Sequence, residues 1–318
     1  MTDSRAGQYP REMNRSGAFI RQDSAFRNLV TADGTSGFPA EAGRYHLYVS
    51  LACPWAHRTI IMRMLKGLES FIGMSVVDPV RDSRGWAFRQ GPGHDLDTLN
   101  SFRFLAEAYT ATDPGFSGRV TVPVLWDKTT GCIVNNESAE IIRMFNSAFG
   151  PLMGNANDYY PAQLRPEIDT INEMVYEKVN NGVYRAGFAT TQAAYQEAYD
   201  ILFTALDELE SRLEEQRYLV GDTITEADWR LFTTLVRFDP VYHGHFKCNR
   251  QRLVDYPNLW GYTRDLFQQP GVAETVNMDH IKRHYYVTHT TINPTGIVPA
   301  GPEIDFLEPH HREVLAAQ

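Results

Sequence analysis

A cysteine followed by a proline stands where one predicted element ends and the next begins. Residues 44–50 are rich in aromatic and branched side chains and predict a strand, and the apolar spacing that follows predicts a helix over 54–66. Between these elements lies the motif Cys53-Pro54-Trp55-Ala56. Cys53 is therefore expected in the first turn of the helix, where unpaired N–H groups and the helix dipole favour an anion. Because the thiolate is the nucleophilic form of cysteine, this position favours a reactive thiol.

The rest of the motif limits what such a thiol can do. Its fourth residue is Ala56 rather than a second cysteine, so no disulfide can form within the motif. A disulfide of Cys53 requires a partner from outside, most simply a small thiol. The alternative is a buried cysteine at a helix start with no chemistry, which is the usual role of an isolated cysteine. The strand–Cys-Pro–helix context favours the reactive interpretation.

Bulk composition excludes several classes of protein. A length of 318 residues favours two domains, and 43% hydrophobic with 22% charged residues is typical of soluble globular proteins. A net charge of −9 without any basic block argues against a nucleic-acid partner. Three scattered cysteines, Cys53, Cys132 and Cys248, are too few for a disulfide framework and suit a reducing compartment. No apolar run resembles a signal peptide or a membrane span, so we expect a cytoplasmic protein with no membrane partner.

The elements predicted over residues 41–147 alternate in type. Strands are expected at 44–50, 71–77, 122–126 and 132–134, and helices at 54–66, 101–109 and 137–145. The order is βαβ, then α, then ββα with the last two strands antiparallel, which is the thioredoxin-like order. Pro123 precedes the third strand and is a candidate cis-proline.

Helical patterns dominate the second half of the chain. A linker rich in Gly, Pro and Asn covers 147–163, and residues 163–280 are predicted to be almost entirely helical. One long helix has an apolar stripe, and another begins at a capping box formed by Thr225 and Asp228. The stripe consists of Leu202, Leu206, Leu209 and Leu213.

The two ends of the chain carry weaker signals. Residues 1–40 are expected to form an irregular arm anchored by aromatic side chains such as Phe19 and Phe26, or else a partly disordered tail. Residues 281–318 are Pro-rich and predict a tail with little helix. We therefore expect an α/β thioredoxin-like N-terminal domain followed by an all-α C-terminal domain, an arrangement that resembles the glutathione-transferase fold.

Several stretches of this sequence resemble the signature motifs of the glutathionyl-hydroquinone reductases, the xi class of the glutathione transferases. The resemblance covers nearly the whole chain, including the arm and the tail, and no motif position departs from it. The stretches are Ala42–Arg58, Val76–Pro79, Thr121–Asp127, Asn135–Ser138, Val179–Ala189, His280–Tyr286 and Ile292–Pro294.

The resemblance implies a reaction, its co-substrate and its assembly. Glutathione is the co-substrate, no metal takes part, and the substrates are glutathionyl-hydroquinones. The cysteine that corresponds to Cys53 attacks the glutathionyl sulfur, the hydroquinone leaves, and a second glutathione resolves the mixed disulfide. The absence of a resolving cysteine at Ala56 agrees with this scheme. A homodimer is also implied, with residues 281–318 folding back over the site.

The resemblance also implies five residues that bind glutathione. Ser138 and nearby N–H groups would hold the γ-glutamyl carboxylate, and Glu137 would bind the ammonium group. Val122 would offer its backbone to the cysteinyl part, Trp86 would cover the bound molecule, and Arg119 would pair with the glycyl carboxylate. Each residue also has an ordinary structural interpretation, as a helix cap, a strand start, a core aromatic or an exposed arginine.

Two tyrosines are implied to face the hydroquinone. The phenol groups of Tyr184 and Tyr285 suit this role because they can donate hydrogen bonds to the substrate oxygens and relay a proton. The chain has 16 tyrosines, so only the surrounding motifs single these two out. His57 lies four residues after Cys53 and is a candidate cation beside the thiolate, or else a packing histidine.

Three other functions remain open from the sequence alone. A conventional glutathione transferase that conjugates electrophiles is disfavoured, because that chemistry usually relies on Ser or Tyr where Cys53 stands. A general glutathione-dependent thiol transferase or dehydroascorbate reductase would share the mixed-disulfide step. A non-catalytic transferase-like module would leave Cys53 dispensable. The group of His243, His245 and Cys248 lacks a fourth ligand at a recognisable spacing, so no metal site is predicted.

Overall fold

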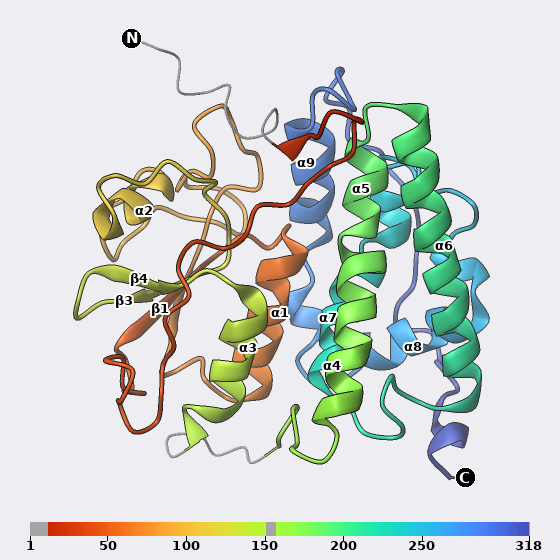
Figure 1. Ribbon diagram of the computed structural model, residues 1–318, viewed down its shortest axis with the longest axis horizontal. Helices are drawn as coiled ribbons and strands as arrows, with labels where there is room; N and C mark the ends of the chain where they lie inside the picture. The colour runs from red at the N-terminus through yellow and green to blue at the C-terminus, as the bar shows by residue number, and fades with distance from the viewer. Residues whose placement is uncertain (1–11, 151–156, 318) are drawn as a thin grey trace. The chain divides into compact units, whose positions relative to one another are not determined.

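The computed structural model describes residues 12–150 and 157–317, so the start of the arm and part of the predicted linker lie outside the described residues (Figure 1). Contacts divide the chain into two compact units. Among the described residues, the first unit comprises 22–150, 157–158 and 275–288, and the second comprises 12–21, 159–274 and 289–317. Neither unit is therefore one continuous stretch of chain.

The first unit is built on a mixed sheet with the strand order β2-β1-β3-β4. Strand β1 (Tyr45–Val49) pairs in parallel with β2 (Gly73–Val76) and antiparallel with β3 (Val124–Asp127). Strand β4 (Cys132–Asn135) pairs antiparallel with β3. Because β1 lies inside the sheet, its aromatic and branched side chains are buried. The fully buried ones are Tyr45, Leu47, Tyr48 and Val49.

Two helices of this unit pack side by side against the sheet, α1 (Pro54–Leu65) and α3 (Ser138–Ser147) (Figure 1). The short helix α2 (Ala106–Thr112) begins later than the helix predicted over 101–109. The reason is a backbone pairing: Phe88 donates its N–H to Arg103, and Leu105 donates to Trp86. Residues engaged in this pairing cannot also form the first turn of a helix.

The prediction of a tail with little helix was wrong for residues 281–288. Helix α9 (Met278–Thr288) crosses the predicted boundary at 280/281 and packs within the first unit. Its buried side chains recur at three- and four-residue spacings, but half of them are histidines, which an apolar pattern does not count. They are His280, Ile281, His284 and Tyr285.

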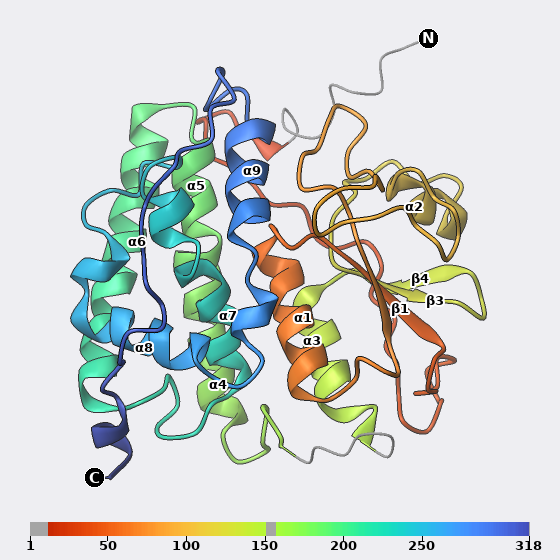
Figure 2. The ribbon, with the colours of Figure 1, turned by 180° about the vertical axis from the view of Figure 1, so that it is seen from behind.

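The second unit is almost entirely helical, as predicted. Figure 2 shows the long helix α6 (Gln192–Glu215) beside α5 (Gly182–Phe188), with which it makes extensive contacts. All four leucines of the predicted stripe are fully buried along α6. A π-helical turn, η4 (Val175–Asn180), joins α5 to α4 (Arg165–Met174). Further helices and turns are α7 (Glu226–Leu235), η5 (Phe238–Tyr242), η6 (Leu253–Asp255), α8 (Pro257–Phe267) and η8 (Glu313–Ala317). The short turn η7 (Ala273–Thr275) lies where the chain passes back to the first unit.

The described part of the N-terminal arm is held by aromatic contacts in each unit. Phe26 packs against Tyr109 and Phe116 of the first unit, with ring centroids 5.5 and 5.7 Å apart. Phe19 packs against Phe188 of the second unit at 5.6 Å. Within the described residues, no helix has both the length and the apolar character that crossing a membrane requires.

Candidate active site

The thiol of Cys53 lies at the start of α1. Cys53 is the N-cap residue, with φ −78° and ψ 122°, and Pro54 occupies the first helical position. It therefore precedes the first turn instead of lying in it, and the free N–H groups of that turn follow directly. The thiol donates to the carbonyl oxygen of Val122 at 3.6 Å. Val122 is buried, and the Val122–Pro123 peptide bond is cis, as the sequence indicated.

Glu137 and Ser138 form the start of α3. Glu137 is the N-cap, and its Oε1 accepts a hydrogen bond from the Ala139 N–H at 3.1 Å. Its Oε2 accepts a second bond from the Ser24 hydroxyl of the arm at 2.9 Å. The ordinary capping role is thus present, and the arm fixes the other carboxylate oxygen. Ser138 is the first residue of the helix and is 3% exposed.

A fully buried arginine links these two helix starts. Arg58 of α1 donates from Nη1 to the Ser138 hydroxyl oxygen at 3.4 Å, and its guanidinium lies 4.5 Å from the Trp55 ring centroid. A hydroxyl that accepts from an arginine keeps its own proton for donation. Arg58 therefore supports Ser138 as a donor to an anion. The sequence did not single it out, because its partner Ser138 lies 80 residues away in the chain.

Trp86 and Tyr285 both contact the His284 ring within the first unit. The Trp86 indole is 4% exposed and stacks on the His284 imidazole, with centroids 5.0 Å apart and planes at 21°. The Arg81 guanidinium lies 4.9 Å from the same indole. Tyr285 is 1% exposed and meets the His284 ring edge-on at 5.2 Å. Both predicted residues thus belong to a packed cluster built on α9.

Tyr184 belongs to the second unit, where it lies on α5. Its ring packs against Phe188 at 6.1 Å, Tyr242 at 6.1 Å and Phe246 at 5.4 Å. Its side chain is only partly buried, whereas Tyr242 and Phe246 are fully buried. Tyr184 is therefore the partly exposed member of an aromatic cluster, an environment that suits contact with a flat ring.

The two remaining candidates take different positions. Arg119 is half-buried in the loop that leads into Val122 and β3. His57 is completely buried, and its Nε2 shares a hydrogen bond with the Thr275 hydroxyl at 2.8 Å. The imidazole of His57 thus contributes to packing between α1 and residue 275 of the same unit.

Comparisons with known proteins decide the family. Residues 52–148 match the family described as Glutathione S-transferase, N-terminal domain, and residues 192–265 match its C-terminal domain. The glutathionyl-hydroquinone reductase YqjG of Escherichia coli is 59% identical over 305 residues, covering 94% of this chain and 93% of that protein. The enzyme of the same name, PcpF, of Sphingobium chlorophenolicum is 54% identical over 90% of both chains. The chain belongs to the glutathionyl-hydroquinone reductases.

Solved structures agree with this family of xi-class glutathione transferases. The glutathione-bound structure of YqjG superposes with a TM-score of 0.89 at 59% identity, covering 91% of this chain and 96% of that one. The xi-class enzyme of Phanerochaete chrysosporium gives a TM-score of 0.90 at 52% identity, over 93% and 96% of the two chains. The predicted fold, a thioredoxin-like domain joined to an all-helical domain, is therefore confirmed for this member of the glutathionyl-hydroquinone reductases.

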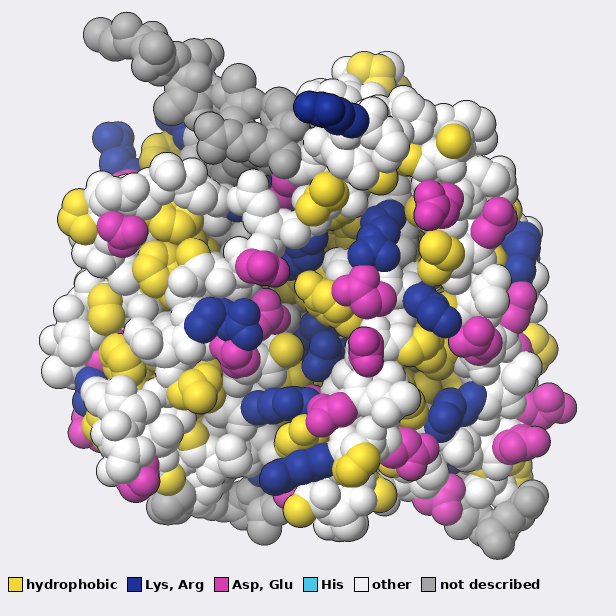
Figure 3. Space-filling view, viewed as in Figure 1, with side chains coloured by type: hydrophobic (Ala, Val, Ile, Leu, Met, Phe, Trp, Pro, Cys, Tyr) yellow, Lys and Arg dark blue, Asp and Glu magenta, His cyan; other side chains and the backbone are white. Residues whose placement is uncertain are grey.

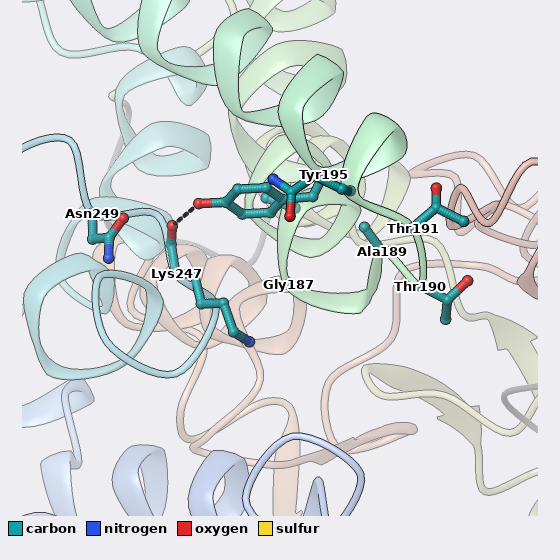
Figure 4. Close-up of a pocket in the computed structure, with 9 residues that line it drawn as sticks. Gly187, Ala189, Thr190, Thr191, Tyr195, Lys247 and Asn249 are labelled. Carbon is teal, nitrogen blue, oxygen red and sulfur yellow. Dashed lines mark hydrogen bonds between the residues drawn. The ribbon is translucent and has the colours of Figure 1, made fainter.

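A surface hollow of the helical unit contains none of the predicted site residues (Figure 4). It encloses about 380 Å³ between the end of α5 and the start of α6. The Tyr195 hydroxyl donates to the Lys247 carbonyl oxygen at 2.7 Å across it. The lining is mostly polar and includes Thr190, Thr191, Gln192 and Asn249. The hollow is therefore lined by none of the residues that the resemblance predicts to bind glutathione or the hydroquinone, although Ala186, Gly187 and Ala189 belong to the matching stretch Val179–Ala189.

Charged side chains and histidines are the candidate metal ligands within residues 12–150 and 157–317. Figure 3 shows acidic and basic side chains interspersed across the visible face. His245 shares a hydrogen bond with His289, with Nε2 and Nδ1 3.2 Å apart. Burial lowers the pKa of His245 to about 4 and raises that of the Cys248 thiol far above its usual range. Across the described residues, no group of three or more potential ligands is arranged to hold a metal ion.

Proposed function

We propose that this protein uses glutathione to reduce glutathionyl-hydroquinones to hydroquinones. The Cys53 thiolate attacks the sulfur of the glutathionyl group, the C–S bond breaks, and its electron pair passes to the ring carbon, which takes up a proton. This leaves free hydroquinone and a Cys53–glutathione disulfide. The thiolate of a second glutathione attacks the glutathionyl sulfur, which releases the Cys53 thiolate and forms glutathione disulfide.

One observation carries this proposal: a cysteine, and not a serine or tyrosine, occupies the N-cap of α1, with its thiol 3.6 Å from the Val122 carbonyl. A hydroxyl at this point would only stabilise the glutathione thiolate, whereas a cysteine thiolate can attack the sulfur of a glutathionyl conjugate and form a mixed disulfide as the hydroquinone leaves. Ala56 cannot resolve that disulfide, and Cys248 is fully buried in the second unit. A diffusible thiol is therefore the simplest resolving agent.

We assign binding roles to five residues within this function. Ser138, supported by Arg58, and the N–H groups of α3 bind the γ-glutamyl carboxylate, and Glu137 binds the ammonium group. Val122 pairs with the cysteinyl backbone in the manner of an added strand. Trp86 covers the bound glutathione. Arg119 pairs with its glycyl carboxylate.

We assign the two tyrosines, Tyr184 and Tyr285, to the hydroquinone, where their phenols donate to its oxygens and one of them supplies the proton. We also propose a cytoplasmic homodimer in which residues 163–280 form the hydroquinone-binding domain and residues 281–318 extend over the site. The cytoplasm is the compartment in which glutathione and free thiols are kept reduced.

The decisive experiment mixes the protein with a glutathionyl-hydroquinone and glutathione and follows the release of free hydroquinone. The Cys53→Ala variant is assayed in parallel, and Cys248→Ala serves as the matched cysteine control. We expect release that Cys53→Ala abolishes and Cys248→Ala retains. Absence of release by the wild-type protein, with glutathione still bound, would refute the proposal and favour conjugation or a non-catalytic role.

A second activity shares the same intermediate. One relative, from Schizosaccharomyces pombe, is named glutathione S-transferase omega-like 2 and is 47% identical over 91% of this chain and 95% of that protein. A general thiol transferase would also reduce a small disulfide through Cys53. Assaying such a disulfide beside the glutathionyl-hydroquinone, at equal concentrations, compares the two activities directly. A higher kcat/KM for the disulfide would make thiol transfer the primary function.

A further inference from the structure

Helix α9 carries three polar side chains that bind the insertion between β2 and α2. His280, His284 and Thr288 are spaced four residues apart and therefore lie on one face of the helix. His280 Nε2 lies 2.7 Å from the Pro92 carbonyl oxygen, and His284 Nδ1 lies 2.7 Å from that of Pro79. The Thr288 hydroxyl accepts a bond from the Arg81 N–H at 3.2 Å.

These contacts place one proton on each of the two histidines. A carbonyl oxygen only accepts, so the facing ring nitrogen carries a proton in each case, Nε2 in His280 and Nδ1 in His284. The contacts involve both ends of the segment 79–92, which places that segment in a defined position on α9. A Cβ at Gly93, whose φ is +77°, would lie 2.9 Å from His280 Nε2, so the backbone approaches the helix too closely for a side chain there.

His284 also contacts Trp86 and Tyr285. The proposed function assigns Trp86 to glutathione and Tyr285 to the hydroquinone. The His284 ring stacks on the Trp86 indole at 5.0 Å, and the Tyr285 ring meets it edge-on at 5.2 Å. Only 7% of the His284 surface is exposed, so its side chain is surrounded by packed protein. His280, one turn earlier, contacts His94 at 5.6 Å, so its ring belongs to a different aromatic pair.

We propose that His284 is a positioning residue whose ring holds the Trp86 indole in the orientation that binds glutathione. The proposal rests on the function proposed above, in which Trp86 covers glutathione. The Nδ1–H bond to Pro79 anchors the imidazole, and the stacked face of that imidazole sets the plane of the indole. Trp86 is thereby held against α9, the helix that also carries Tyr285.

Two substitutions separate the ring from the hydrogen bond. His284→Phe keeps an aromatic face and loses the donor, whereas His284→Asn keeps a donor near the Nδ1 position and loses the ring. His284→Leu is a second ring-free variant, used if His284→Asn does not fold. His280→Asn is the matched control, because it removes the equivalent bond from the same helix without touching Trp86.

The Kd of glutathione for each full-length variant is measured by titration calorimetry. The KM for glutathione and the kcat are measured in the turnover of a glutathionyl-hydroquinone. We expect the ring-free variant to raise the Kd and KM for glutathione about tenfold with little change in kcat, as suits the loss of one aromatic contact. His284→Phe and His280→Asn should stay within about threefold of the wild type. In a Trp86→Ala background, removing the His284 ring should have no further effect on Kd.

Several outcomes would overturn the proposal. An unchanged Kd in the ring-free variant would show that the ring does not position Trp86. An equal loss in His284→Phe or His280→Asn would assign the effect to the hydrogen bonds of α9, and an additive loss in the Trp86→Ala background would show that His284 does not act through Trp86. The calorimetric Kd does not depend on turnover. If the wild-type protein binds glutathione but releases no hydroquinone, the proposed function is refuted. The calorimetric test of His284 can still be interpreted in that case.

Discussion

At the scale of single residues, the three cysteines differ in their exposure to solvent. Cys53 and Cys132 are partly exposed, whereas Cys248 is fully buried and its pKa is raised far above the usual range by burial. Because reagents attack the exposed thiolate, a thiol-specific reagent should modify two thiols in the native protein and all three cysteines only after unfolding. Spectrophotometric thiol counting with and without denaturant makes this measurement.

The matched variants for this thiol count are Cys53→Ala and Cys248→Ala. The first should lower the native count by one thiol, and the second should leave the native count unchanged while lowering the denatured count. A native count that already includes Cys248 would contradict the packing of that side chain.

A pair of glycines on α5 gives a stability prediction. An ideal Cβ at Gly187 would lie 2.2 Å from the Phe246 ring, whereas one at Gly182 would lie 3.5 Å from Leu202. Gly187→Ala must therefore displace a buried ring and should lower the free energy of unfolding by about 1–3 kcal/mol. Gly182→Ala should be neutral or stabilise by about 0.5–1 kcal/mol, because alanine favours the helix. Chemical denaturation of both variants measures the difference, and equal effects would contradict the close packing of Phe246.

At the scale of elements, the capping box of α7 makes a second stability prediction. Asp228 accepts hydrogen bonds from the N–H groups of Leu219 and Thr225 and from the Tyr262 hydroxyl, at 2.8–2.9 Å, and it is fully buried. Asp228→Asn replaces one accepting oxygen with an NH₂ group that faces donors. We expect a loss of about 3 kcal/mol in the free energy of unfolding.

The matched control for this cap is Asp255→Asn. Asp255 forms a similar box with Arg252, but its side chain is 42% exposed, so the same substitution should cost less than about 1 kcal/mol. Both variants are compared by urea denaturation. Similar losses at the two positions would show that burial does not set the strength of the α7 cap.

The elements that the sequence predicted well are those determined by local pattern. β1 and α1 follow from an aromatic, branched stretch and an apolar 3.6-residue period, and the cap of α7 follows from Thr225 and Asp228. The errors arose where distant contacts decide the structure. The start of α2 is displaced because residues 103–105 pair with residues 86–88, and α9 buries histidines that carry no hydrophobic signal.

The same division applies to the candidate site. The position of Cys53 at a helix start was predictable because it depends on neighbouring residues alone. Arg58 and His284 were not predictable, because their roles depend on partners 80 and 205 residues away in the chain. Only a fold brings Arg58 to Ser138 and His284 to Pro79. Sequence motifs thus located the proposed nucleophile, whereas the residues proposed to support the site required the structure.

At the scale of the whole molecule, the two units exchange segments. Residues 12–21 of the arm belong to the second unit although residues 22–150 belong to the first, and residues 275–288 return to the first unit before 289–317 complete the second. Each unit is therefore completed by a segment far away in the sequence. Such nonlocal closure slows folding, since the intervening chain must be ordered before the contacts form.

The stability of the molecule should decrease in mild acid because each unit holds a histidine whose surroundings favour the neutral form, half-buried His46 and buried His245. Burial lowers the pKa of His46 in the first unit and of His245 in the second, each to about 4 from the usual 6.5. The charges of Lys128 and Arg63 lower the pKa of His46 further, and the charge of Asp97 raises it. The charge of Lys247 lowers the pKa of His245 further. Between pH 6.5 and 4 the unfolded chain binds more protons than the folded one, so stability present above pH 6.5 is lost as the pH falls.

At pH 5 the loss should be on the order of 1–2 kcal/mol per histidine. Thermal unfolding between pH 7.5 and 5 measures it, and His46→Gln or His245→Gln should flatten the dependence. A pH profile as steep in both variants as in the wild type would assign the acid sensitivity to other groups.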